Sequence, residues 1–168
     1  MRFTREELEL AFEAYQACGK RAATTHDWNP WAEQFTEHAT YIEHLYGTFH
    51  GREEIRPWIT RTMTMFPGVR MPIFPVTWYV VDEDRGWIVA EIVNRMEDPG
   101  DGSVHEAANL TVLHYAGDGQ WSHEEDVYNP NNFMAMIQGW CRRADELGNL
   151  PDDARSWQAA VRRAAARG

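Results

Sequence analysis

The sequence predicts a single α+β domain, and three patterns in its 168 residues indicate this fold class. Apolar residues recur at helical spacing in the first part of the chain, alternate in runs between short turns in the middle, and return to helical spacing at the end. Helices, then neighbouring strands, then helices are typical of an α+β domain with a curved antiparallel sheet. A chain of this length can bury one core, and we find no internal repeat, low-complexity segment or linker.

The first helix is predicted to begin after Thr4, because Thr4 and Glu7 form a capping box. It extends to about Gly19, and residues 20–27 are expected to connect it to the next helix. Its buried stripe consists of Leu8, Phe12 and Tyr15.

A second helix is predicted to open at Asn29 and Pro30, which suit a cap and a first helical turn. Trp31, Ala32 and Phe35 form its buried side. A strand then begins near Ala39 and is broken by Gly51. With a period of two residues, one face of this strand carries Ala39, Tyr41, Glu43 and Leu45, and the other carries Thr40, Ile42, His44 and Tyr46.

A third helix is predicted over about 52–65, although Pro57 lacks a backbone donor, so the regular part could begin at Arg56. The β-type runs are 73–81, 86–96, 105–115 and 121–128, and the turns between them are 82–86, 98–102 and 117–119. Such turns predict an antiparallel meander. Further helices open at Asn129-Pro130 and at Pro151.

Composition excludes several classes of partner. Lys and Arg number 16 against 26 Asp and Glu, so a net charge of −10 disfavours nucleic acid and anionic membranes. The basic tail is read as a solvated or dimer-facing helix. Cys18 and Cys141 are isolated, which predicts reduced core thiols, and the seven histidines lack ligand spacing, so no metal or other cofactor is expected. Without a signal peptide or an apolar run of membrane-spanning length, the chain is expected to be cytoplasmic.

Several short segments together resemble a known family. They are Asp27-Trp28, 35–41, Gly47, 51–55, Gly119-Gln120-Trp121 and 125–130. Because these segments occur in this order, the chain resembles a SnoaL-like protein of the nuclear transport factor 2-like (NTF2-like) superfamily. The resemblance implies an NTF2-like, cystatin-like cone in which a curved sheet wraps a pocket roofed by the N-terminal helices. It divides the chain into a SnoaL-like domain over 1–140 and a C-terminal helical extension over 141–168.

The resemblance also implies functional positions. Glu43 matches the strand position of the aspartate base in ketosteroid isomerase and of an asparagine in limonene epoxide hydrolase. Asn94 and Asp126 match the positions of the two hydrolase aspartates, and Thr111 matches the oxyanion-donating aspartate of the isomerase. Asn94 cannot take up a proton and Thr111 is a weaker donor than a neutral carboxylic acid, so neither activity transfers unchanged.

The residues themselves add physical arguments. Apolar neighbours would raise the pKa of Glu43 and suit it to act as a base, whereas the alternative is an ion pair to an arginine such as Arg52 or Arg95. Asp126 shares a polar face with Ser122, Glu124 and Tyr128, which by period alone predicts exposure. Asn94 is a candidate donor in the pocket. Glu43 and His44 point to opposite faces of a regular strand, so only one reaches the cavity, and Glu43 is preferred.

Two functions remain open at this point. The first is a cofactor-free acid/base enzyme, of isomerase, dehydratase or polyketide-cyclase type, acting on a hydrophobic carbonyl- or hydroxyl-bearing molecule. The second is a non-catalytic small-molecule-binding or dimerisation module, and epoxide hydrolysis is a further alternative. The candidate catalytic residues are Glu43, Asp126 and Asn94. The candidate substrate-binding residues are Tyr15, Trp31, Tyr41, His44, Trp58, Asn109, Thr111 and Tyr128; Trp28 and Trp78 are further candidates for an aromatic pocket, and a homodimer is expected.

Overall fold

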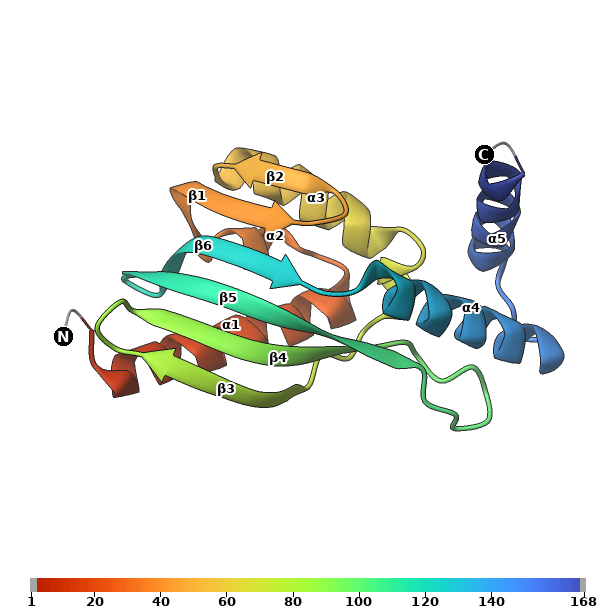
Figure 1. The fold of residues 1–168 in the computed structure, drawn as a ribbon, viewed down its shortest axis with the longest axis horizontal. Helices are drawn as coiled ribbons and strands as arrows, with labels where there is room; N and C mark the ends of the chain where they lie inside the picture. Colours follow the sequence, from red (N-terminus) through yellow and green to blue (C-terminus); the bar gives the residue numbers. More distant parts are fainter. Residues whose placement is uncertain (1–2, 167–168) are drawn as a thin grey trace.

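A computed structural model describes residues 3–166 and shows an α+β architecture (Figure 1). The helices are α1 (Arg5–Thr25), α2 (Asn29–Ala32), α3 (Arg52–Thr64), α4 (Pro130–Glu146) and α5 (Asp152–Ala165), with a short 3₁₀ turn, η1 (Gly68–Arg70). The strands are β1 (Phe35–Glu43), β2 (Gly47–His50), β3 (Val76–Asp82), β4 (Trp87–Arg95), β5 (Glu106–Gly117) and β6 (Gln120–Val127). None of the described helices has the length and apolar character needed to cross a membrane.

The strands form one curved, open sheet in the order β2-β1-β6-β5-β4-β3. The predicted antiparallel meander is confirmed for β3 to β6. The sheet as a whole is mixed, however, because β1 pairs with β6 in parallel. The prediction of a purely antiparallel sheet is therefore wrong: no local pattern reveals the return of the last strand to the first, since that pairing depends on residues far apart in sequence.

The N-terminal helices lie together behind the sheet in Figure 1 and cover its inner face. The predicted start of α1 is confirmed, because Thr4 Oγ1 accepts a hydrogen bond from the Glu7 amide. Its predicted end at Gly19 is wrong, since the helix runs to Thr25 and includes most of the expected connector. Ala22 and Ala23 continue the buried stripe, and burial offsets the helix penalty of about 1 kcal/mol for an internal glycine.

The second helix is shorter than predicted and ends at Ala32. Phe35 is fully buried, as expected, but it begins β1 rather than ending a helix. The single strand expected up to Gly51 is in fact a hairpin of β1 and β2. Gly47, with φ 115°, adopts a backbone conformation that other residues rarely reach and so permits the reversal.

The third helix begins at Arg52, so the alternative start at Arg56 is wrong. Pro57 lies inside the helix and leaves the carbonyl of exposed Glu53 to water, which reduces the penalty of the missing donor. The strand expected from residue 73 begins at Val76, and Ile73 forms only an isolated bridge to Arg95.

The buried apolar residues form two clusters. The larger lies between the inner sheet face and α1 to α3, and the smaller joins α4 and α5 to the ends of β4 and β5. Cys18 and Cys141 are buried and free, as predicted. The division into 1–140 and 141–168 stays a prediction, and α4 runs through residue 140. In Figure 1, α4 continues beyond the end of β6 and α5 stands at the far end of the molecule.

Candidate functional site

A cavity of about 960 Å³ lies on the inner face of the sheet and continues past α3 towards α4 and α5. Its walls are largely aromatic and aliphatic, including Trp28, Trp31, Trp58, Phe74, Phe133 and Trp157. A pocket of this size and character suits a hydrophobic small molecule held by a few polar groups. Polar side chains of β1, β4, β5 and β6 line one part of the cavity, and three of them carry carboxyl groups: Glu43, Glu124 and Asp126.

Glu43 is the last residue of β1 and only 6% of its surface is exposed. Its Oε2 accepts hydrogen bonds from the backbone amides of Leu45 and Tyr46, at 2.7 Å each. Its Oε1 accepts a bond from the Tyr128 hydroxyl. These three donors fix the position of the Glu43 carboxyl group at the wall of the cavity, beside the turn between β1 and β2.

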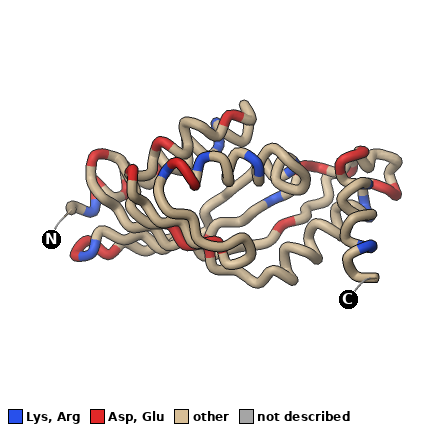
Figure 2. Tube along the Cα trace, turned by 90° about the horizontal axis from the view of Figure 1, so that it is seen from above, with Lys and Arg blue, Asp and Glu red and all other residues tan. Residues whose placement is uncertain are grey.

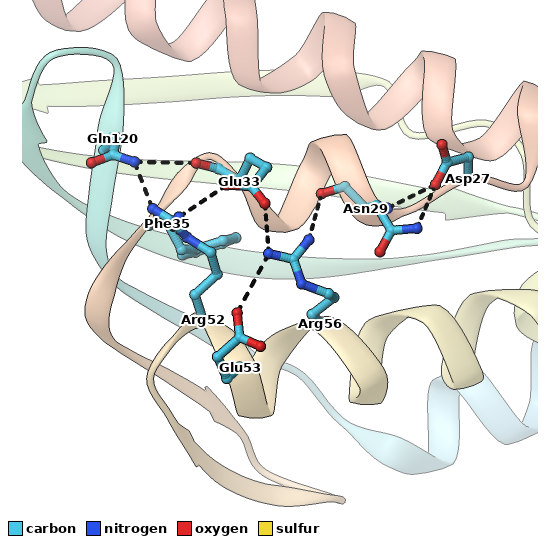
Figure 3. A network of polar contacts seen from close by, with 8 residues as sticks. All are labelled: Asp27, Asn29, Glu33, Phe35, Arg52, Glu53, Arg56 and Gln120. Atoms are coloured by element: carbon cyan, nitrogen blue, oxygen red, sulfur yellow. Dashed lines mark hydrogen bonds and ion pairs between the residues drawn. The ribbon is translucent and has the colours of Figure 1, made fainter.

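The predicted alternative, an ion pair between Glu43 and Arg52 or Arg95, is wrong. Arg52 donates to Glu33 and to the carbonyl of Phe35, beside the Arg56–Glu33 ion pair (Figure 3). Arg95 pairs with Glu106 on the neighbouring strand. Within residues 3–166, Glu43 has no Lys or Arg within ion-pair distance, so hydrogen bonds rather than a cation stabilise it.

Asp126 sits beside Glu43, because the two residues are paired in the parallel register of β1 and β6. Its Oδ1 accepts from Asn109 Nδ2 at 2.8 Å and from Thr111 Oγ1 at 2.6 Å. Its Oδ2 accepts from the Tyr41 hydroxyl at 2.5 Å. The face shared with Glu124 points into the cavity, so the exposure predicted from alternation is wrong.

Burial raises the pKa of Asp126 from 3.8 to about 6, and the neighbouring charge of Glu43 acts in the same direction. The hydrogen bonds from Thr111, Tyr41 and Asn109 oppose this rise in pKa, because they favour the carboxylate. A carboxyl group with a pKa near neutrality can both accept and release a proton under physiological conditions.

Asn94 reaches this network through a second amide. Its Nδ2 donates to Asn109 Oδ1 at 2.7 Å, and Asn109 in turn donates to Asp126. Asn94 lines the cavity, as expected for a pocket donor. Hydrogen bonds therefore link Asn94 to Asp126 through Asn109, whereas Glu43 lies beside Asp126 in the strand register and accepts from a separate set of donors.

Glu124 is a functional candidate that the sequence analysis missed. Only 1% of its surface is exposed, and its Oε1 accepts a bond from the Tyr15 hydroxyl at 2.8 Å. Burial and the charge of Asp126 raise its pKa well above the ordinary value, while the hydroxyls of Tyr15 and Tyr41 oppose the rise. Its position two residues before Asp126 was the available signal, because alternate residues of a strand share a face.

The other candidates divide clearly. Seven of the candidate substrate-binding residues line the cavity: Tyr15, Trp31, Tyr41, Trp58, Asn109, Thr111 and Tyr128. His44 lies outside it, exposed and 2.8 Å from Glu125 Oε1, so its assignment to substrate binding is wrong. Trp78 is also exposed, on the outer face of β3. Across the described residues, no group of three or more His, Cys, Asp or Glu side chains is arranged to hold a metal ion.

The fold and the cavity define the class: an NTF2-like, cystatin-like cone with a pocket on the concave side of its sheet. The profile of the SnoaL-like domain matches residues 13–124, which is most of the chain. The protein therefore belongs to the SnoaL-like family, and the resemblance identified from its sequence is confirmed. A comparison with curated proteins finds no match.

Solved structures agree with this fold. A Bacillus subtilis protein described as a candidate isomerase has a TM-score of 0.61 and 16% identity, over 80% of this chain and 94% of its own. A candidate polyketide cyclase from Xanthomonas campestris has a TM-score of 0.57 and 16% identity, over 79% and 97%. SalBIII, an epoxide hydrolase/cyclase-like enzyme of pyran ring formation in salinomycin, has a TM-score of 0.58 and 14% identity, over 79% and 97%.

Proposed function

We propose that the protein is an acid/base enzyme that acts on a hydrophobic small molecule bearing a carbonyl or hydroxyl group. One observation carries this proposal: Glu43 and Asp126 lie side by side on paired strands and open onto the same largely apolar cavity. Burial raises the pKa of Asp126 to about 6, which suits proton transfer near neutrality, and among the described residues no Lys or Arg pairs with Glu43. The family and the names of the structural relatives agree with this type of chemistry.

In this proposal Glu43 removes a proton from the carbon next to the substrate's carbonyl group. Its hydrogen bonds to Leu45, Tyr46 and Tyr128 hold the carboxylate in position for the transfer. Asp126, with a pKa of about 6, is the partner acid or the group that orients a water molecule. Isomerisation, dehydration and aldol-type cyclisation share this first step, so the site suits all three.

The alternative of a binding module is less well supported. An arginine that neutralised Glu43 would favour it, but among the described residues no Lys or Arg pairs with this carboxyl group. Epoxide hydrolysis by the limonene hydrolase mechanism is also less well supported, because Asn94 stands at the position of one of the two hydrolase aspartates and carries no carboxyl group.

We also propose that the protein forms a homodimer through the outer face of the sheet. This face carries exposed apolar side chains from β3 to β6, namely Trp78, Val80, Trp87, Leu110 and Val127. Acidic and basic positions are interspersed over much of the chain (Figure 2), and this face also carries Glu91, which pairs with Trp78 on one side and with Leu110 on the other. A second copy of the chain would cover it.

Exchange of hydrogen for deuterium in simple ketones tests the enzymatic proposal without knowledge of the natural substrate. Cyclohexanone, 2-tetralone and 2-decalone would be incubated with the protein in D₂O, and loss of the protons next to the carbonyl followed by NMR. We expect exchange above the solvent rate, and a loss of about 10²–10⁴-fold in Glu43→Gln.

Glu125→Gln is the matched control, because Glu125 neighbours Asp126 in sequence but pairs with His44 outside the cavity. It should leave the exchange rate unchanged. Exchange that matches the solvent background for all three ketones, or that is unaffected by Glu43→Gln, would rule out the enzymatic proposal and favour a binding module.

A further inference from the structure

Three side chains that could donate a hydrogen bond to a substrate oxygen are already engaged within the protein. Tyr41 and Thr111 donate their hydroxyl protons to Asp126, and Asn94 donates to Asn109. If Glu43 removes a proton next to a carbonyl group, negative charge develops on the carbonyl oxygen and requires a donor. The donor must therefore come from another group that lines the cavity.

Glu124 has a free oxygen at this site. Its Oε1 is bonded to Tyr15, but its buried Oε2 has no hydrogen-bond partner among the described residues, although the side chain lines the cavity. Trp28 and Trp58 also line the cavity, and their buried indole nitrogens have no hydrogen-bond partner among the described residues. Buried polar groups are nearly always hydrogen-bonded, so partnerless groups around one cavity indicate a polar ligand.

We propose that Glu124 is a neutral carboxylic acid that donates its Oε2 proton to the oxygen of a bound ketone or other carbonyl compound. This inference rests on the proposed function and adds Glu124 to Glu43 and Asp126 as a further catalytic residue of the same site. The groups facing Glu124 act in both directions. Burial, the Asp126 carboxyl group on β6 and apolar Leu113 opposite it on β5 favour a neutral acid, whereas the Tyr15 hydroxyl from α1 and the Tyr41 hydroxyl from β1 favour the charged form; burial is the largest of these effects.

The strand register supports a ligand bound between the two acids. Glu124 pairs with Tyr41, whereas Glu43 pairs with Asp126, two residues further along the same strands. Strand geometry then separates the Cα atoms of Glu43 and Glu124 by about 8 Å across the diagonal. At that separation the two side chains can contact opposite ends of one carbonyl group and its neighbouring carbon, rather than each other.

The proposed step is balanced. Glu43 takes the proton from the carbon, the C–H electron pair forms a carbon–carbon double bond, and the C=O π pair moves to the oxygen. The oxygen takes the proton of Glu124, which gives an enol, a neutral Glu43 and a Glu124 carboxylate hydrogen-bonded by Tyr15. Return of the proton from Glu43 to the same or another carbon, and of the enol proton to Glu124, completes exchange or isomerisation.

Infrared spectroscopy tests the proposal directly. At pH 8 in D₂O we expect a band of a protonated carboxyl group in the parent protein that is absent in Glu124→Gln and retained in Glu125→Gln. The carbonyl band of bound ¹³C-labelled 2-tetralone should lie well below its position in hexane, and should move towards the hexane value in Glu124→Leu. Circular dichroism establishes that each variant is folded.

Deuterium exchange then separates this inference from the proposed function. We expect Glu124→Gln to lower the exchange rate about 10²-fold, because an amide donates a hydrogen bond but transfers no proton. If exchange depends on Glu43 but the carboxyl and carbonyl bands are the same in the parent and the Glu124 variants, this inference is overturned and the enzymatic proposal stands. If the bands depend on Glu124 but no ketone exchanges, Glu124 is a binding donor and the enzymatic proposal fails.

Discussion

Replacing Asp126 with asparagine should change how the stability of the protein depends on pH. The native structure raises the pKa of Asp126 from 3.8 to about 6, so the folded state holds this proton more tightly than the unfolded chain does. The resulting stabilisation is complete below pH 3.8 and is lost as pH rises through about 6. Above that range, burial of the carboxylate charge opposes folding.

The size of the effect follows from the rise in pKa. One unit of pKa corresponds to about 1.4 kcal/mol, so a rise from 3.8 to about 6 corresponds to roughly 3 kcal/mol. The asparagine side chain of the variant has no proton to gain or lose, so the variant lacks this contribution. The stability of the variant minus that of the parent should therefore increase by roughly 2–3 kcal/mol between pH 4 and pH 8.

Urea unfolding, followed by tryptophan fluorescence at several pH values from 4 to 8, measures this difference. Asp118→Asn is the control, because it makes the same chemical change in an exposed turn and should give a profile parallel to that of the parent. A difference between Asp126→Asn and the parent that is constant across this range, or that decreases with rising pH, would refute the reasoning.

Three further predictions concern the fold and the assembly. Leu113→Ala should lower the free energy of unfolding, measured in urea, by roughly 2–5 kcal/mol, because this side chain is 0% exposed. Leu10→Ala, at an exposed position of α1, should change it little, and equal losses in the two variants would contradict the prediction. Gly51→Ala should lower the melting temperature more than Gly148→Ala does. Both glycines have a positive φ, but a Cβ at Gly51 would lie 2.9 Å from the carbonyl oxygen of Glu37, whereas a Cβ at Gly148 would meet nothing within 4 Å. Thermal melts of the two variants test this difference. Sedimentation equilibrium at micromolar concentration should give twice the mass of the chain, and Trp78→Glu should shift it towards one chain; a parent protein that sediments as one chain would disprove the dimer.

Local signals in the sequence predicted most of the secondary structure. The Thr4 capping box, the Gly- and Asp-containing turns of the meander and the proline at the start of α4 each act through neighbouring residues, and each is confirmed. The errors arose where tertiary contacts decide the outcome. Residues 20–25 are helical because Ala22 and Ala23 are buried, and no signal close in sequence indicates the parallel pairing of β1 with β6.

The candidate site was predictable in part for a related reason. Glu43 stood out because its strand neighbours are apolar, and its burial is confirmed. Glu124 did not stand out, because a strand face rich in polar residues looks the same whether it meets water or a polar patch inside a pocket. Alternation identifies which residues share a face, but the direction of that face depends on the helices that cover it.

The parallel pairing of β1 with β6 has a consequence for synthesis of the chain on the ribosome. Glu43 and its donor Tyr128 are 85 residues apart, so β1 and β2 emerge long before the strand that completes their pocket. Until β6 inserts between β1 and β5, one edge of β1 lacks its backbone partners and Glu43 lacks one of its donors. The polar wall of the cavity and the complete sheet are thus formed in the same late event, and a chain truncated before β6 would lack both.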